Sequence, residues 1–146
     1  MQESHDFFLD TFDAVSEDEI SSLLFPLLSW DRIFFFGDLG SGKSTFIRAL
    51  LRSHFADESL IVRSPTYTYY QKYGRDIYHF DLYRVESLDN IFLIGAMDIF
   101  ENPRAICLIE WPEILTGSLR ATKKISLSQS TDGTRTYTIE SLKREH

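Results

Sequence analysis

Residues 37–44 read Gly37-Asp38-Leu39-Gly40-Ser41-Gly42-Lys43-Ser44, which is the pattern G-x-x-x-x-G-K-[ST] of a phosphate-binding loop, the P-loop. Glycines in this pattern let the backbone curl until successive N–H groups point at phosphate oxygens. The Lys43 ammonium can reach the β- and γ-phosphates of a nucleotide, and the Ser44 hydroxyl can ligate Mg²⁺. We therefore expect ATP or ADP to be bound by Asp38, Leu39, Gly40, Ser41, Gly42, Lys43, Ser44 and Thr45.

The segments on either side of the loop have the patterns of a strand and a helix. Residues 33–36 are a short apolar run that ends at Gly37, which is typical of a buried strand. Residues 44–52 place their apolar side chains at helical spacing. A strand, a glycine-rich turn and a helix whose N-terminus faces that turn form an anion site, so this context supports the motif.

The composition indicates one globular domain spanning residues 1–146. The chain is 43% apolar and 14% aromatic, which is typical of a packed protein and not of a disordered one. The formal net charge is −7. Such a chain is a poor candidate for holding nucleic acid by itself, because that affinity comes largely from Lys and Arg on phosphates.

Location and redox chemistry are also constrained by the sequence. No run reaches the length of a membrane span, and the N-terminus lacks a secretory h-region, so we expect a cytoplasmic protein with no membrane contact. The single cysteine, Cys107, lies in the apolar run 105–109. This setting favours a buried small hydrophobe over a catalytic thiol.

The remaining segments predict an α/β domain with a P-loop NTPase-like fold, a largely parallel sheet flanked by helices, and a C-terminal antiparallel hairpin at its edge. Asp132-Gly133 marks the hairpin turn. Ser16 begins a capping box, and the apolar positions after it predict a helix that Pro26 kinks or shortens. A helix capped by Ser87 is expected through residue 94. Strands are expected at 7–9, 60–63, 67–73, 76–80, 105–109, 122–128 and 134–139.

Two carboxylates follow expected buried strands. Asp81 ends the run 77–81, and Glu110 ends the run 106–110. Strands of an α/β sheet deliver their ligand-facing groups at their carboxyl ends. Either residue can therefore help to hold Mg²⁺ at the P-loop, although a surface acid after a strand is the simpler reading of each one alone.

A hydroxyl-bearing loop and several flanking side chains are further candidates. The segment 64–68 lies between the P-loop helix and Asp81, and Thr66 can approach the γ-phosphate or the metal as a switch segment does. An ordinary proline turn is the alternative. His79 is more typical of a packed residue than of a metal ligand. Arg84 can bind a phosphate or remain solvated, and Trp111 can belong to the core or cover the site.

Four segments in order resemble the TsaE family (also called YjeE), small bacterial P-loop ATPases. These are the P-loop, Ser64-Pro65-Thr66-Tyr67, His79-Phe80-Asp81-Leu82-Tyr83-Arg84 and Leu108-Ile109-Glu110-Trp111. The resemblance covers residues 15–128. It implies a part in forming threonylcarbamoyladenosine in tRNA together with the TsaD–TsaB complex, with tRNA held mainly by those partners.

The resemblance also implies roles for individual residues. Ser44 and Glu110 would be the Mg²⁺ positions, and Lys43 with the loop amides would hold the phosphates. Asp81 and Thr66 would lie near the γ-phosphate, so that the expected catalytic residues are Lys43, Asp81 and Thr66.

The chain departs from the family pattern at two places. Ser44 stands where the family usually has threonine, and it keeps the hydroxyl that a metal needs. Many members carry a glutamate pair where this chain reads Leu88-Asp89-Asn90-Ile91-Phe92-Leu93-Ile94-Gly95, in which Asp89 alone is charged. We therefore transfer no role to this segment.

Three other functions compete with an ATPase. A small-molecule kinase shares the P-loop, but it would need an acceptor pocket and usually an arginine-rich lid, whereas the arginines here are scattered along the sequence. A GTPase would usually carry an N-K-x-D motif for guanine, and none occurs, so adenine is the expected base. A binding module with a structural nucleotide is the third alternative.

Overall fold

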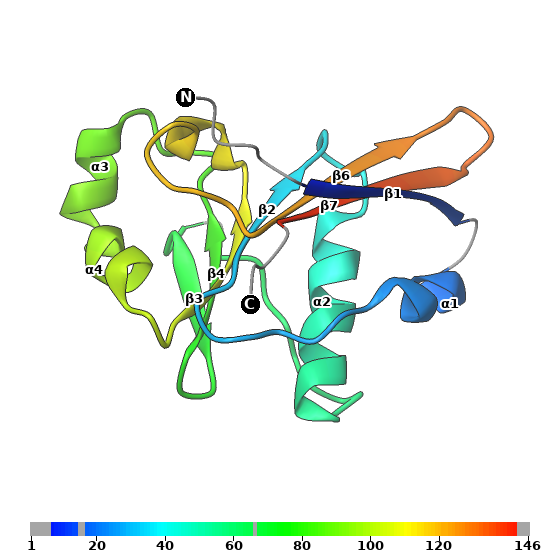
Figure 1. The fold of residues 1–146 in the computed structure, drawn as a ribbon, viewed down its shortest axis with the longest axis horizontal. Helices are drawn as coiled ribbons and strands as arrows, with labels where there is room; N and C mark the ends of the chain where they lie inside the picture. Colours follow the sequence, from blue (N-terminus) through cyan, green and yellow to red (C-terminus); the bar gives the residue numbers. More distant parts are fainter. Residues whose placement is uncertain (1–6, 15–16, 66, 143–146) are drawn as a thin grey trace.

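A seven-stranded sheet forms the centre of the molecule (Figure 1). The computed structural model describes residues 7–14, 17–65 and 67–142. The strand order is β1-β7-β6-β2-β5-β4-β3. The strands are β1 (Phe7–Ala14), β2 (Arg32–Phe36), β3 (Tyr70–Tyr73), β4 (Ile77–Asp81), β5 (Ile106–Glu110), β6 (Lys123–Gln129) and β7 (Arg135–Leu142).

The predicted P-loop NTPase-like α/β class is confirmed. The central strands β6, β2, β5 and β4 are mutually parallel, while β1, β7 and β3 pair antiparallel at the two sides. The helical elements are α1 (Glu17–Ile20), η1 (Ser21–Leu23), α2 (Lys43–Phe55), α3 (Leu88–Leu93), α4 (Ala96–Glu101) and η2 (Pro112–Leu115).

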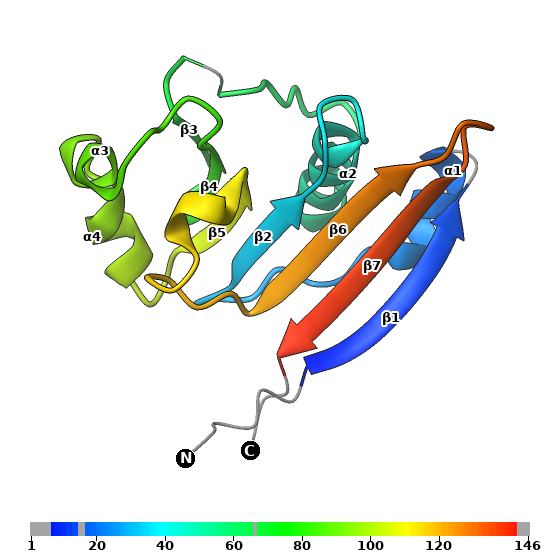
Figure 2. The same cartoon turned by 90° about the horizontal axis from the view of Figure 1, so that it is seen from above.

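Helices cover both faces of the parallel strands, as Figure 2 shows. Alternation along β2 explains this, because successive side chains point to opposite faces of a sheet. Ile33 and Phe35 join the core beneath α2, whereas Phe34 joins the core on the side of α3 and α4. On β5, Cys107 is buried in that second core, as its apolar setting predicted.

The C-terminal hairpin is present, but its predicted place at the edge of the sheet is wrong. Strand β1 runs antiparallel to β7 from Phe7↔Leu142 to Ala14↔Arg135, so β1 forms the edge. The first strand is also longer than the expected 7–9. A strand whose partner lies at the far end of the sequence cannot be bounded from local pattern alone, because its pairing is set by tertiary contacts.

The N-terminal helix is much shorter than its apolar pattern predicted, and the Ser16 of its capping box lies outside the described residues. The helical turns end at Leu23, and Leu24 is already extended with ψ of 148°. Pro26 explains this, because proline cannot donate to a helix and disfavours helical geometry in the residue before it. Leu27 still reaches the core, while Leu28 is exposed.

The expected strand at 60–63 is absent, and the strand expected from residue 67 begins only at Tyr70. Leu60 and Val62 nevertheless pack against the core beneath α2, which accounts for their strand-like alternation. This segment forms hydrogen bonds with side chains instead of pairing with a strand of the sheet. Arg52 Nε donates to the Leu60 carbonyl, and the Arg63 amide donates to the Tyr73 hydroxyl. The expected helix after Ser87 is confirmed, and its hydroxyl accepts from the Asn90 amide.

Candidate nucleotide-binding site

The P-loop connects the carboxyl end of β2 to the first residue of α2, which is Lys43. Gly42 precedes the helix with φ of 107°, a left-handed conformation that favours glycine. A Cβ at Gly37 would lie 2.5 Å from Ser41 Oγ and 2.8 Å from the Leu127 carbonyl oxygen. These two glycines therefore let the loop close tightly on itself and on β6.

A cleft of about 470 Å³ opens over this loop. It gathers six of the predicted nucleotide-binding residues, which are Leu39, Gly40, Gly42, Lys43, Ser44 and Thr45. Asp38 and Ser41 belong to the loop but do not line the cleft. Asp38 is exposed, and its carbonyl oxygen accepts a hydrogen bond from the amide of the buried Ser41.

Lys43 lies inward, and its side chain is held by two contacts. Its Nζ donates to the Gly37 carbonyl oxygen at 2.5 Å and lies 3.5 Å from the centre of the Trp111 ring. Burial lowers the Lys43 pKa, while the negative charges of Glu110 and Asp81 act in the opposite direction. The cation that the motif supplies for phosphates is thus present in the cleft beside two carboxylates.

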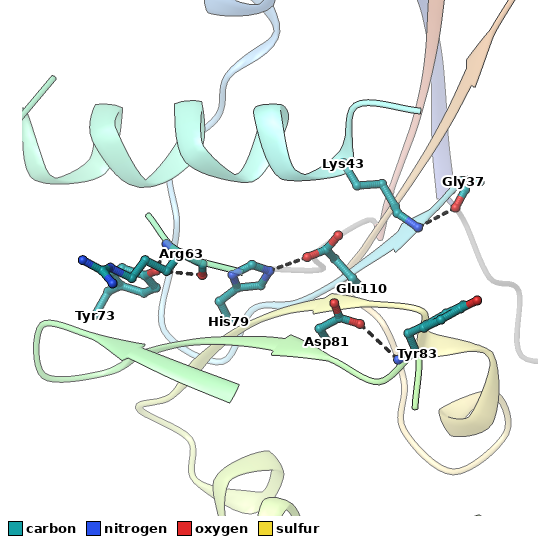
Figure 3. A network of polar contacts seen from close by, with 8 residues as sticks. All are labelled: Gly37, Lys43, Arg63, Tyr73, His79, Asp81, Tyr83 and Glu110. Atoms are coloured by element: carbon teal, nitrogen blue, oxygen red, sulfur yellow. Dashed lines mark hydrogen bonds and ion pairs between the residues drawn. The ribbon is translucent and has the colours of Figure 1, made fainter. Parts of the chain in front are cut away.

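Glu110 is buried at the end of β5 and lines the cleft. Its Oε2 lies 2.6 Å from His79 Nε2, a contact between neighbouring strands. Figure 3 shows the Glu110 carboxylate between the His79 ring and the Lys43 side chain. His79 is therefore packed and hydrogen-bonded, and it touches the residue expected to bind the metal.

Asp81 ends β4 directly beside Glu110 in the parallel ladder. Its Oδ1 accepts from the Tyr83 amide at 3.0 Å, which fixes the carboxylate at the cleft (Figure 3). Burial raises the Asp81 pKa, and the negative charge of Glu110 adds to this effect. The two carboxylates thus meet at one edge of the sheet, as their positions after parallel strands predicted.

The flanking side chains form one wall of the cleft. Trp111 packs against Tyr83 with ring centres 4.9 Å apart, and it also covers Lys43. Of the two interpretations of Trp111, covering the site therefore describes its position better than belonging to the core. Arg84 lines the cleft too, with its guanidinium 4.7 Å from the centre of the exposed Tyr67 ring.

Sequence reasoning missed Arg135, the first residue of β7, which also lines the cleft. The signal in the sequence was only the Asp132-Gly133 turn two residues earlier. That turn predicts a hairpin, but it does not show that the hairpin reaches the P-loop. Thr66, expected near the γ-phosphate, lies outside the described residues. Its neighbour Ser64 lines the cleft.

The donors in the cleft suit Mg²⁺ bound together with a nucleotide. Mg²⁺ prefers oxygen ligands and usually takes one or two carboxylates plus phosphate oxygens and water. The Ser44 hydroxyl and the Glu110 and Asp81 carboxylates supply such atoms on the cleft wall. No group of three or more His, Cys, Asp and Glu able to hold a metal occurs among the described residues.

The central parallel strands, with a P-loop between β2 and α2, define the class of P-loop NTPase-like α/β proteins. The chain belongs to the TsaE family, because the family model described as threonylcarbamoyl adenosine biosynthesis protein TsaE matches residues 12–137. The resemblance seen in the sequence is thereby confirmed.

Two relatives illustrate the range of similarity. A tRNA threonylcarbamoyladenosine biosynthesis protein TsaE from Haemophilus influenzae is 43% identical over 84 residues, which are 56% of this chain and 51% of that protein. The match therefore spans about half the length of that relative. The protein of the same name from Borreliella burgdorferi is 33% identical over 114 residues, covering 73% of this chain and 78% of that protein.

A solved structure supports the fold. Bacillus subtilis YdiB superposes with a TM-score of 0.64 at 21% identity, covering 96% of this chain and 90% of that chain. In the part of the chain that the structure describes, none of the helices has the length and apolar character needed to cross a membrane.

Proposed function

We propose that this chain binds ATP with Mg²⁺ and hydrolyses it. The observation that carries the proposal is the meeting of Lys43, Asp81 and Glu110 in the cleft over the P-loop. These residues come from three separate elements, α2, β4 and β5, and they bring a cation suited to phosphates and two carboxylates suited to Mg²⁺ together.

The division of labour follows from chemistry and position. Lys43 and the loop amides would bind the β- and γ-phosphates. Ser44 and Glu110 would hold Mg²⁺, which supplies positive charge to the phosphates when bound. Asp81 would orient the attacking water, and we keep Thr66 as its proposed neighbour near the γ-phosphate.

The biological setting is proposed from the family. The relatives are named for tRNA threonylcarbamoyladenosine biosynthesis, and we propose the same role here, in the cytoplasm and in association with the TsaD–TsaB complex. The net charge of −7 supports a protein that meets tRNA through its partners, because an acidic chain repels phosphates.

Phosphate release from ATP, measured with and without TsaD–TsaB and at several Mg²⁺ concentrations, tests the proposal. We expect Mg²⁺-dependent release that is slow for the chain alone and rises with the partners. Equal turnover in both cases would remove the partner dependence but leave the ATPase. Absence of ATP binding would overturn the proposal.

A small-molecule kinase remains the alternative function. Arg84 and Arg135 are distant in sequence, yet both line the cleft, so the scattered arginines no longer argue against a kinase. A kinase would pass the γ-phosphate to an acceptor, whereas an ATPase releases it as inorganic phosphate. The phosphate-release assay therefore separates these two functions.

A further inference from the structure

Arg135 lies against the P-loop, although it comes from the C-terminal hairpin. A Cβ at position 42 would be 3.1 Å from Arg135 Nη1 and 3.2 Å from its Cζ, so the guanidinium packs directly over Gly42. Arg135 also lines the cleft beside Gly40, Lys43 and Ser44. The hairpin thus brings a second cation to the loop.

The charge of this arginine is available to a ligand. The Arg135 side chain is partly buried, and its guanidinium forms no hydrogen bond or ion pair with residues 7–14, 17–65 or 67–142. Lys43 differs, since it feels the carboxylates of Glu110 and Asp81 and donates to the Gly37 carbonyl. A guanidinium has five N–H donors in a planar fork, which matches two phosphate oxygens at once.

The topology indicates which phosphates Arg135 can meet. Strands β5 and β4 lie on one side of β2 and carry Glu110 and Asp81, while β6 and β7 lie on its other side and carry Arg135 (Figure 2). In the proposed function, the two carboxylates mark the metal and the γ-phosphate. Arg135 therefore approaches the nucleotide from the side away from the γ-phosphate, which is the phosphate that reacts.

We propose that Arg135 binds the α- and β-phosphates of the nucleotide and anchors ADP and ATP equally. This inference rests on the proposed function, namely nucleotide binding at the P-loop. Gly42 favours this close contact, because a Cβ there would crowd the guanidinium at 3.1–3.3 Å. Arg135 is then a binding residue present in both the substrate and the product complex.

Calorimetric titration of the full chain with Mg²⁺–ADP, and with Mg²⁺ and a non-hydrolysable ATP analogue, tests this inference. Arg135→Ala should raise the Kd of both nucleotides by about tenfold or more and by similar factors, because each loses a charge-assisted contact. Arg135→Lys keeps the charge but loses the fork, so a smaller rise is expected.

Arg75→Ala is the matched control. Arg75 is exposed in the turn between β3 and β4, at the end of β4 that is opposite to Asp81, and its loss should leave both Kd values unchanged. If Arg135→Ala fails to fold, the rise in Kd expected for Arg135→Lys tests the inference instead.

The outcomes separate this inference from the proposed function. Wild-type affinity for both nucleotides in the Arg135 variants would overturn the inference and leave the proposed function intact. Unchanged Kd values with reduced turnover would place Arg135 at the γ-phosphate and would also overturn it. A wild-type chain that binds neither nucleotide would overturn the proposed function itself.

Discussion

His79 Nε2 lies 2.6 Å from Glu110 Oε2, and the two side chains are only 1% and 5% exposed. They stand on the neighbouring parallel strands β4 and β5, where His79 pairs with Leu108 and Glu110 pairs with Asp81. A buried carboxylate is costly without a partner, so the histidine stabilises it there. The contact also fixes the direction of a side chain proposed to bind metal, as hydrogen-bonded neighbours of metal ligands do.

Replacing His79 by alanine should therefore affect both stability and metal use. We expect the free energy of unfolding to fall by about 1–3 kcal/mol, because Glu110 loses its buried partner. The Mg²⁺ concentration for half-maximal hydrolysis should rise as well. Urea unfolding and Mg²⁺ titration measure these effects, with His54→Ala as the exposed control. A destabilised variant with an unchanged Mg²⁺ midpoint would limit His79 to a structural role.

Lys43→Ala should weaken ATP binding or abolish hydrolysis, because it removes the cation that we propose binds the β- and γ-phosphates. Lys72→Ala is a suitable control, since Lys72 is an exposed lysine of β3 that lies over the Tyr78 ring. Calorimetry with ATP makes the comparison. Equal affinity in the wild type and the Lys43 variant would contradict a phosphate role for this residue.

Arg32→Leu should unfold the protein more easily without any direct effect on the site. The buried guanidinium of Arg32 donates to the carbonyl oxygens of Phe100, Asn102, Ala105 and Asp31. Loss of these donors should cost about 3 kcal/mol or more, because hydrogen bonds donated by a charged group are stronger than those between neutral groups. Urea unfolding measures the change, and Arg104→Leu at an exposed position should be nearly neutral.

The local part of the site could be predicted from the sequence. The P-loop requires its residues to be contiguous, and Glu110 and Asp81 follow parallel strands whose carboxyl ends share one edge. Residues that reach the site through long-range pairing could not be found in this way. The Arg135 position depends on how β6 lies beside β2 and β7 beside β6, which no local pattern records.

The same distinction explains the errors in the fold. The apolar positions after Ser16 have helical spacing, but Pro26 and the packing of Leu27 override it. Leu60 and Val62 alternate like a strand, yet the place beside β4 is taken by β3. Tertiary contacts determine the structure of these segments. In β2 and α2, by contrast, the local pattern and the burial favour the same structure.

The raised pKa of Asp81 predicts a pH dependence of stability. A carboxyl group whose pKa in the folded state exceeds its unfolded value of about 3.8 contributes stability below that value, and this contribution is lost as pH rises through the folded pKa. Asp81→Asn should therefore gain stability relative to the wild type between pH 4 and pH 7. Urea unfolding at both values measures the gain. A constant difference between the two proteins would contradict it.

A Mg²⁺ titration of ATP hydrolysis should distinguish the roles of Glu110 and Asp81. Glu110→Gln removes charge that offsets the cation, so the Mg²⁺ concentration needed for half-maximal activity should rise. Asp81→Asn should lower the hydrolysis rate with ATP binding and Mg²⁺ demand nearly unchanged, because orienting the water matters only in the transition state.

The effects of the two substitutions can be distinguished although both side chains line the same cleft. Glu110 is held by His79, whereas Asp81 is held by the Tyr83 amide. Each substitution keeps the size of its side chain and one oxygen acceptor, so the compared change is mainly the loss of charge. A shifted Mg²⁺ midpoint in Asp81→Asn, with an unshifted one in Glu110→Gln, would show that the roles are reversed. In that case the shorter side chain binds the metal, and Glu110 positions the water.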